Sequence, residues 1–212
     1  MYDFGSHDGR PYLVMELVDG RNLAEELSVS RLLAPGRVAY LAAQTAAGLA
    51  AAHRHGVIHR DIKPGNLLVY ADDTLRIADF GIARFTDEAT AGLTTSGQVI
   101  GTSAYLAPER ALGRPAVPAS DMYSFGCVIY ELLVGHPPFR GDNAASVVHQ
   151  HVATPPIPLG RLRPELPGAL EDYVARLLSK EPGYRPTADE AAAWFDAWLH
   201  DRPASMGTAP LS

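Results

Sequence analysis

The stretch from His59 to Asn66 (HRDIKPGN) constrains this chain more than any other part of its 212 residues. It follows a long Ala-rich pattern typical of a helix and precedes the apolar run 67–69, so we expect a loop between a helix and a strand. The loop offers a carboxylate at Asp61, an ammonium at Lys63 and an amide at Asn66. This set suits phosphoryl transfer, in which a carboxylate accepts a hydroxyl proton, a cation faces phosphate and an amide oxygen binds a metal ion.

Two further motifs follow this loop. Asp79-Phe80-Gly81 begins thirteen residues after Asn66, and Ala107-Pro108-Glu109 comes later in the chain. In this order the three segments resemble the H-R-D-x-x-x-x-N, D-F-G and A-P-E signatures of protein kinases. The resemblance covers about residues 1–200, from the fourth strand of a kinase small lobe onward. We therefore expect an α+β fold: a mainly helical kinase large lobe with a residual two-stranded piece of the small lobe.

The expected organisation has three parts: small-lobe strands at 1–17, the hinge and large lobe at 18–200, and a loose tail at 201–212. Asn22 with Glu25, and Thr187 with Glu190, have the spacing of capping boxes at helix starts. The segment 121–133 has little polar face, which predicts a helix at the centre of the core. The other expected elements are strands at 1–4 and 12–15 around a turn at 5–9, a connector at 16–20, a hairpin at 67–77, and helices at 35–55, 143–152, 169–180 and 188–199.

Composition excludes several classes of function. The formal net charge of −6 gives no basic patch, so nucleic acid is not an expected partner. The single cysteine, Cys127, cannot form an internal disulfide and lies in an apolar run, which favours a reducing compartment. No stretch approaches the roughly 18 apolar residues of a membrane-spanning helix, and the first residues lack a signal-peptide pattern. These features predict a soluble, cytoplasmic protein.

The resemblance implies a bacterial, eukaryotic-like (Hanks-type) serine/threonine kinase that uses ATP and Mg²⁺ to phosphorylate protein Ser/Thr hydroxyls. It implies Asp61 as the catalytic base, with Lys63 beside the phosphoryl group in transfer. Asn66 and Asp79 would hold Mg²⁺, an ion that prefers hard oxygen ligands. For Asp61 and Asn66 the alternative is an ordinary turn residue.

Four more residues take structural or catalytic roles by resemblance. The Thr102 hydroxyl would bridge the catalytic base and the lysine of the loop. Glu109 would form a buried ion pair with Arg185, a kind of pair that fixes position more than it adds stability. Asp121 would brace the backbone of the catalytic loop; the alternative is an acidic residue favoured by the helix dipole.

Regulatory and nucleotide-binding positions also follow from the resemblance. Thr94 and Thr95 lie where bacterial kinases of this kind autophosphorylate, and Arg60 is the expected partner of the phosphate. The alternative is a solvated loop of hydroxyl residues. The positions that would bind adenine rest on the resemblance alone. Met15 would be the gatekeeper at the back of the adenine slot, and the backbone of Glu16 and Val18 would bind the adenine edge. Leu68 would form the apolar floor of the slot.

Parts of a kinase small lobe have no counterpart in these residues. No two glycines lie two positions apart, so there is no G-x-G-x-x-G loop, and no lysine precedes Lys63. Because phosphoryl transfer depends almost entirely on positioning and electrostatics, we expect the 212 residues alone to be a weak or inactive kinase. Two alternatives stay open: a non-catalytic, pseudokinase-like interaction module, and a gene whose true start lies upstream. The intact catalytic and metal positions favour catalysis over the module.

Overall fold

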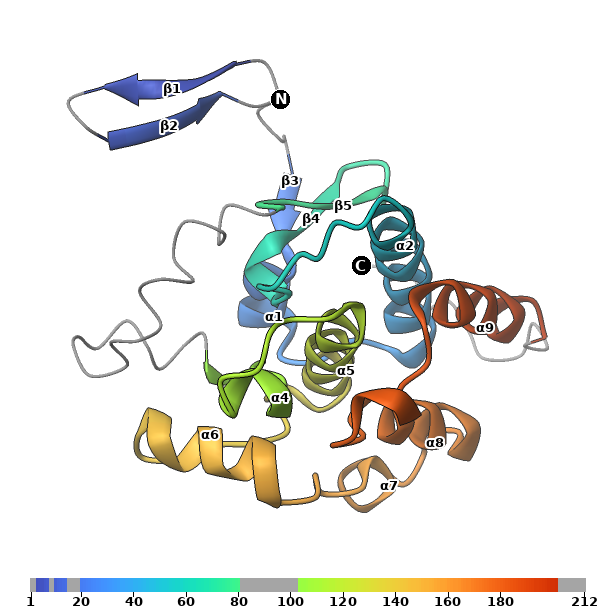
Figure 1. The fold of residues 1–212 in the computed structure, drawn as a ribbon. Coiled ribbons are helices and arrows are strands. Elements are labelled where there is room, and N and C mark those ends of the chain that lie inside the picture. Colours follow the sequence, from blue (N-terminus) through green and yellow to red (C-terminus); the bar gives the residue numbers. More distant parts are fainter. Residues whose placement is uncertain (1–2, 8–9, 15–19, 81–102, 202–212) are drawn as a thin grey trace.

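Helices form most of the part of the chain that the computed structural model describes, residues 3–7, 10–14, 20–80 and 103–201 (Figure 1). The strands are β1 (Asp3–His7), β2 (Arg10–Val14), β3 (Gly20–Asn22), β4 (Leu67–Tyr70) and β5 (Leu75–Ile77). The helices are α1 (Leu23–Ser30), α2 (Pro35–Arg54), η1 (Pro64–Asn66), α4 (Pro108–Ala111), α5 (Pro118–Val134), α6 (Ala144–Ala153), α7 (Leu159–Leu162), α8 (Gly168–Leu177), η4 (Pro182–Tyr184) and α9 (Ala188–His200). This arrangement confirms the predicted mainly helical lobe with a small strand content.

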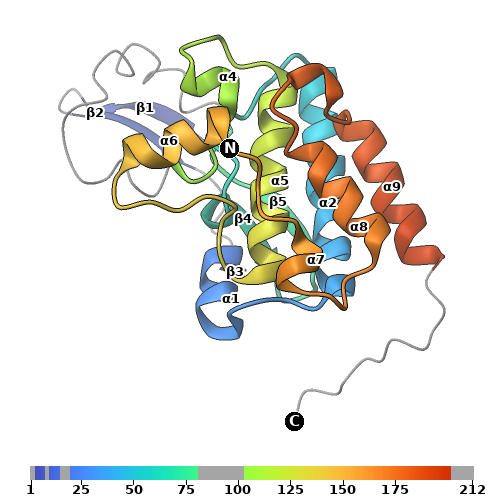
Figure 2. The same cartoon turned by 90° about the horizontal axis from the view of Figure 1, so that it is seen from below.

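Helix α5 is the centre of the body. Every residue from Ser120 to Leu133 except Glu131 is buried. The helix packs against α2, α7 and α8, and Figure 2 shows it with α2 and α9 on one side and α6 on the other. The apolar pattern at 121–133 therefore predicted its position correctly, because a helix without a polar face has to be covered on all sides.

Side-chain hydrogen bonds cap the starts of two helices. The Asn22 side chain accepts a hydrogen bond from the Glu25 amide at 2.9 Å, and the Glu25 carboxylate accepts from the Asn22 amide at 3.1 Å. Thr187 and Glu190 form the same reciprocal pair at the start of α9. Both predicted capping boxes are confirmed, and each satisfies backbone donors that have no partner within the helix. Helix α2 begins at Pro35 as predicted and ends one residue before the predicted His55.

A three-stranded antiparallel sheet lies next to the catalytic loop, in the order β3-β4-β5. The predicted hairpin is confirmed, with Leu67 opposite Ile77. Strand β3 was missed, because the prediction placed Gly20 in the connector 16–20 and Asn22 at the start of a helix. Its pairing, with Asn22 opposite Leu68, is made across 46 residues of sequence. Three residues without β-branched or aromatic side chains carry little strand signal of their own.

The first two strands form an antiparallel pair in which Asp3 lies opposite Val14 and Gly5 opposite Tyr12. The prediction placed 5–9 in a turn, and that boundary is wrong because β1 continues through His7. Pairing of the two strands explains the extension, since each added residue gains partners for its backbone. The predicted Asp8-Gly9 turn and the tail beyond Asp201 lie outside the described residues. Within the described ranges, no helix combines the length and hydropathy needed to cross a membrane.

The contact between α5 and α8 leads to a first prediction. A Cβ atom at Gly126 would lie 2.8 Å from the Leu177 Cβ and 3.2 Å from the Leu178 Cδ2. Gly126→Ala gains about 1 kcal/mol of helix propensity, but overpacking in a filled core costs about 1–3 kcal/mol. We expect a lower free energy of unfolding in urea. Gly168→Ala is the matched control, because no atom lies within 4 Å of its Cβ position; it should be neutral or slightly stabilising. Equal effects of the two substitutions would contradict the packing argument.

Candidate active site

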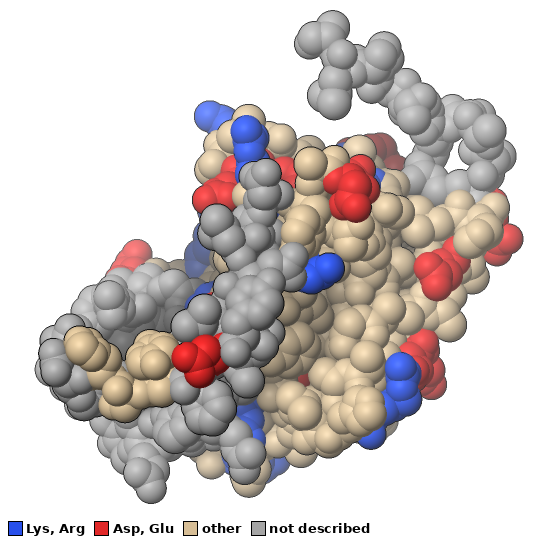
Figure 3. All heavy atoms as spheres, turned by 90° about the horizontal axis from the view of Figure 1, so that it is seen from above, with Lys and Arg blue, Asp and Glu red and all other residues tan. Residues whose placement is uncertain are grey.

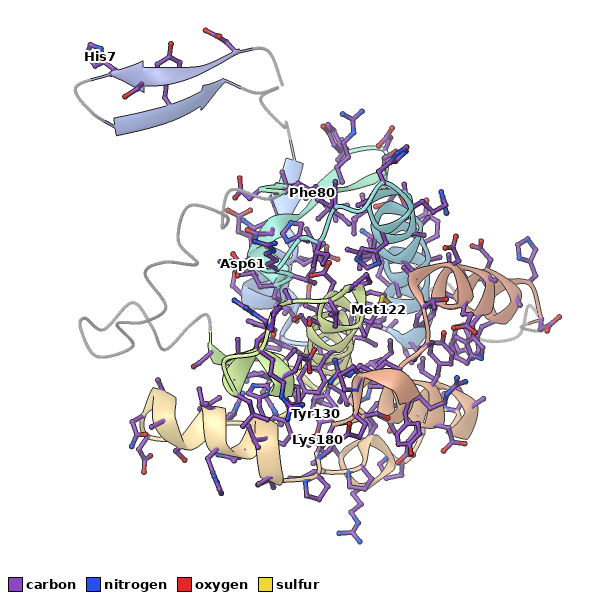
Figure 4. The ribbon with its side chains drawn as sticks, viewed as in Figure 1. His7, Asp61, Phe80, Met122, Tyr130 and Lys180 are labelled. Atoms are coloured by element: carbon purple, nitrogen blue, oxygen red, sulfur yellow. The ribbon has the colours of Figure 1, made fainter. Side chains whose placement is uncertain are left out.

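The loop from His59 to Asn66 connects α2 to β4 and ends in the short helix η1. In Figure 4, Asp61 and Phe80 lie on the same side of the body, close to the three-stranded sheet. The helix–loop–strand context expected from the sequence is therefore present. The segment after β5 returns to this loop, because the Ala78 amide donates to the Asn66 carbonyl at 2.8 Å.

The Asp61 carboxylate is held by two side chains of its own loop. The Lys63 ammonium donates to Asp61 Oδ2 at 2.6 Å. Asn66 Nδ2 donates to the Asp61 carbonyl at 2.7 Å and to Oδ2 at 3.1 Å. The side chains of Asp61 and Lys63 remain 30% and 31% exposed. The oxygen Oδ2 is thus fixed by donors, and a hydroxyl group that enters from solvent can reach the partly exposed side chain.

Asn66 and Asp79 have the chemistry of a magnesium site. Asn66 is buried, and its amide nitrogen is occupied by Asp61, so the amide oxygen is the atom presented for a cation. Asp79 is exposed and follows directly after the Ala78–Asn66 backbone bond. Mg²⁺ binds through one or two protein oxygens together with phosphate oxygens. These two residues fit that pattern.

Asp121, in the first turn of α5, braces the catalytic loop. Its Oδ2 accepts the His59 backbone N–H and its Oδ1 accepts the Arg60 backbone N–H, both at 2.8 Å. The carboxylate is 1% exposed. The bracing role implied by the resemblance is therefore observed. Asp121 also lies at a helix N-terminus, where the dipole favours a negative charge. The contact with the loop and the favourable position in the helix dipole are therefore compatible.

Two histidines complete this support. His53, in the last turn of α2, places its Nε2 at 2.8 Å from Asp121 Oδ2. The fixed tautomer of His59 follows from its partners. Its Nδ1 accepts the Asp61 N–H at 3.2 Å, so Nε2 carries the proton and donates to the Ala78 carbonyl at 2.7 Å. His59 thereby joins the catalytic loop to the segment that carries Asp79.

Two of the four non-glycine residues with positive φ in the described part of the chain lie at the same place. Arg60 (φ 74°) and Asp79 (φ 60°) both have left-handed backbone conformations. Such a conformation costs a non-glycine residue on the order of 1–3 kcal/mol and persists only where neighbouring groups enforce it. The Asp121 carboxylate holds the Arg60 amide in that conformation. The strain therefore belongs to the loop geometry that presents Asp61.

Glu109 and Arg185 form the predicted buried pair. Arg185 Nη1 and Nη2 donate to the two Glu109 oxygens, each at 2.8 Å. The remaining guanidinium donors bind the carbonyls of Ser179, Ala119 and Lys180, so all five N–H groups that an arginine offers are used. Burial alone would raise the pKa of the Glu109 carboxyl, but hydrogen bonds from Arg185 and Ser120 outweigh it and lower the pKa below its ordinary value. The pair fixes the segment after residue 102 to α5 and η4.

A second contact of this segment was not predicted. The Tyr105 hydroxyl donates to Glu131 Oε2 at 2.5 Å, and the Ser124 hydroxyl donates to the Tyr105 carbonyl at 2.7 Å. Burial raises the pKa of Glu131, although the Tyr105 hydrogen bond opposes that shift. After Asp121, Glu131 is the one charged residue of α5, and that isolated charge in a mostly apolar stretch was the available signal.

The remaining predicted site residues have different outcomes. Thr102, Thr94, Thr95, Met15, Glu16 and Val18 lie outside the described residues, so their roles stay predictions. Leu68 is half-buried in β4, on the face opposite Leu67 and Val69. The charges on the face shown in Figure 3 are mixed, with acidic and basic side chains interspersed among the described residues.

Comparisons with known proteins agree with this geometry. The protein kinase domain family matches residues 1–195. The serine/threonine-protein kinase PknB of Mycolicibacterium smegmatis is 40% identical over 184 residues, which cover 86% of this chain and 29% of that protein. The PknB of Mycobacterium tuberculosis H37Rv is 41% identical over 184 residues, which cover the same shares. The probable serine/threonine-protein kinase SCO3848 of Streptomyces coelicolor is 39% identical over 200 residues, or 94% of this chain and 30% of that protein.

The chain belongs to the protein kinase family, among bacterial kinases of the Hanks type. It spans less than a third of the length of the curated relatives that it matches. The family assignment agrees with the three sequence motifs and with the contacts of Asp61 and Asp121.

The buried pair leads to a second prediction. Removal of one partner of such a pair leaves an uncompensated buried charge and costs about 3–5 kcal/mol. We expect Arg185→Met to lower the free energy of unfolding in urea by that amount. The double variant Glu109→Gln/Arg185→Met should lose clearly less than the sum of the two single variants. Additive losses would contradict a direct coupling between the two side chains.

The same pair gives a pH dependence. The lowered pKa means that the Glu109 charge stabilises the fold above the carboxyl group's ordinary pKa of 4.5, and that this stability is lost as the pH falls through the folded-state pKa. The difference in unfolding free energy between the unsubstituted chain and Glu109→Gln should therefore shrink as the pH falls from 4.5 through the folded-state pKa. A difference that stays constant with pH would contradict the assigned charge state.

Proposed function

We propose that this lobe carries the catalytic residues of a serine/threonine protein kinase that transfers the γ-phosphoryl group of ATP to protein hydroxyls. One observation carries the proposal: the Asp61 carboxylate is oriented by Lys63 and Asn66 and is still open to solvent. A general base needs a fixed direction and access to the proton that it accepts. The Hanks-type relatives, which are named serine/threonine-protein kinases, support the class of acceptor.

The chemistry follows from these positions. Asp61 aligns the substrate hydroxyl and accepts its proton as the hydroxyl oxygen attacks the γ-phosphorus. The bond between that phosphorus and the β–γ bridging oxygen breaks, and ADP leaves. The Lys63 ammonium, held beside Asp61, stabilises the negative charge on the phosphoryl oxygens. Phosphoryl transfer of this kind depends on positioning and electrostatics.

Asn66 and Asp79 would hold magnesium. The ion, when bound, neutralises charge on the phosphate oxygens of ATP. The chain itself orients these two magnesium ligands. Asp61 fixes the Asn66 amide, and the strained segment that His59 supports carries Asp79.

Further roles belong to the same proposal and rest on the family resemblance. Thr102 would add a hydroxyl between Asp61 and Lys63. Thr94 and Thr95 would be autophosphorylated, with Arg60 as the phosphate partner. The adenine would be bound by Met15, Glu16, Val18 and Leu68. A kinase that uses ATP in this way would act in the cytoplasm.

The alternative is a non-catalytic interaction module. It is favoured by one observation, the lack of a G-x-G-x-x-G motif and of any lysine before Lys63 in these 212 residues. Those groups position ATP in protein kinases. We therefore propose that the 212 residues alone transfer phosphate slowly or not at all, and that the site becomes competent with a complete small lobe.

The test joins the small lobe of the M. smegmatis relative to the start of this chain. With labelled ATP, Mg²⁺ and a Ser/Thr peptide, we expect phosphate incorporation by the fused protein and little by the 212 residues alone. Asp61→Asn should lower transfer at least about 10²-fold, the lower range for loss of a general base, and leave ATP affinity within a few-fold. Asp172→Asn, an exposed position on α8, is the matched control. A fused protein without transfer would support the interaction module. Turnover that Asp61→Asn does not change would contradict the role of Asp61 as the catalytic base.

A further inference from the structure

A groove of about 510 Å³ lies behind the catalytic loop, where three parts of the fold meet. Its walls are the last turn of α2, the first turn of α5, and the chain that leads from η4 into α9. Figure 4 shows Met122, which lines this groove, on the side of α5 toward α2 and α9, and Asp61 on the other side. Protein cavities of about 300–1,000 Å³ hold small molecules. The proposed reaction does not use this groove.

Most of the lining is apolar and held in place by the fold. Met122 and Ala188 line the groove and are buried, so they belong to its inner wall. Three proline rings form much of the rest, namely Pro118, Pro182 and Pro186. Because the proline ring fixes its own backbone angle, this part of the wall changes little when a ligand binds.

The Arg and Asp side chains that line the groove already have partners. Arg54 Nη1 donates to Asp189 Oδ1 at 2.5 Å, and these two side chains are 60% and 64% exposed, so the pair lies at the rim. Arg185 is bound to Glu109 and to three backbone carbonyls. A charged ligand would lose its hydration without gaining a counter-charge. The groove therefore suits an uncharged ligand.

One polar atom of the lining remains available, Nδ1 of His53. The Nε2 atom of the same ring lies 2.8 Å from Asp121 Oδ2, and a carboxylate only accepts hydrogen bonds, so Nε2 carries the proton. In the neutral ring, Nδ1 is then an acceptor. With the residues that the structure describes, Nδ1 forms no hydrogen bond, and it is not among the enclosed atoms that lack one. The side chain is 90% buried, with 10% exposed where it lines the groove.

We propose that this groove is a binding site for an uncharged small molecule with an apolar body and one N–H or O–H donor. The donor bonds to His53 Nδ1, and the apolar body lies against Met122 and the proline rings. The ligand contacts the same imidazole that binds Asp121, so the site adjoins the brace of the catalytic loop. This site does not depend on phosphoryl transfer by the chain.

The first experiment compares two probes of the same shape with the full 212-residue chain. Indole has an N–H donor where benzofuran has an oxygen atom. In titrations followed by ¹H–¹⁵N NMR, we expect indole to bind about five-fold more tightly, the effect of one hydrogen bond. The largest shifts should be those of the Gly183 and Ala188 amides. Indole-3-carboxylate, which carries a charge, should bind more weakly than indole.

Three results of these titrations would overturn the proposal. Equal affinities of indole and benzofuran would show that His53 Nδ1 accepts no hydrogen bond from the ligand. Preference for the carboxylate would contradict an uncharged site. Shifts centred on Leu68 would place the probe in the predicted adenine slot instead of the groove.

The second experiment fills the groove from a position where a side chain meets no neighbour. Gly183 lines the groove, and no atom lies within 4 Å of its Cβ position. We expect Gly183→Leu to lose most of the affinity for indole. Gly168→Leu is the matched control, since its Cβ position is equally open and lies at the start of α8. Equal indole affinity in the two variants would contradict binding in the groove.

The third experiment removes the acceptor. In His53→Lys the ammonium group keeps a donor for Asp121, and lysine has no acceptor in its side chain. We expect the five-fold preference for indole over benzofuran to disappear. The ratio of the two affinities is measured within one variant, so a change in stability does not affect it. A preference that persists in His53→Lys would overturn the assignment of Nδ1, whether or not the chain proves to be an active kinase.

Discussion

The geometry of the site depends on one buried carboxylate, Asp121. Withdrawal of a charge from water is costly unless hydrogen bonds replace the lost solvation. Here the backbone amides of His59 and Arg60 and the ring of His53 supply three, all at 2.8 Å. In return the carboxylate holds Arg60 in a left-handed conformation that such a residue rarely adopts. The direction of Asp61 is therefore a consequence of a contact between a loop and the start of a distant helix.

The first two turns of α5 support both sides of the site in the same way. Asp121 holds the catalytic loop, Ser120 donates to Glu109 at 2.6 Å, and Ser124 holds the Tyr105 carbonyl. All three lie on a helix that is buried along almost its whole length. A rigid helix holds such side chains in fixed positions, and a site that works by positioning its groups requires this. The catalytic loop and the segment from Tyr105 to Glu109 are thus held by the same helix.

Short-range patterns in the sequence predicted most of the local structure, whereas the roles of the site residues follow from the family resemblance and stay predictions. The capping boxes, the apolar period of α5 and the spacing from Asp61 to Asn66 each involve residues close in the chain. The missed features depend on contacts between distant residues. His53 reaches Asp121 across 68 positions, Tyr105 reaches Glu131 across 26, and β3 exists through its pairing with β4. Nothing in the residues next to them indicates these partners.

The most direct measurement is hydrogen exchange of the Arg60 amide in the full chain. If Asp121 holds the loop, this amide should be strongly protected although it lies in a loop, and Asp121→Asn should speed its exchange at least about ten-fold, as expected for a hydrogen bond to a charged group. The Leu177 amide in α8 should change only as far as global stability falls. An Arg60 amide that exchanges in the unsubstituted chain as fast as an open loop would contradict the account.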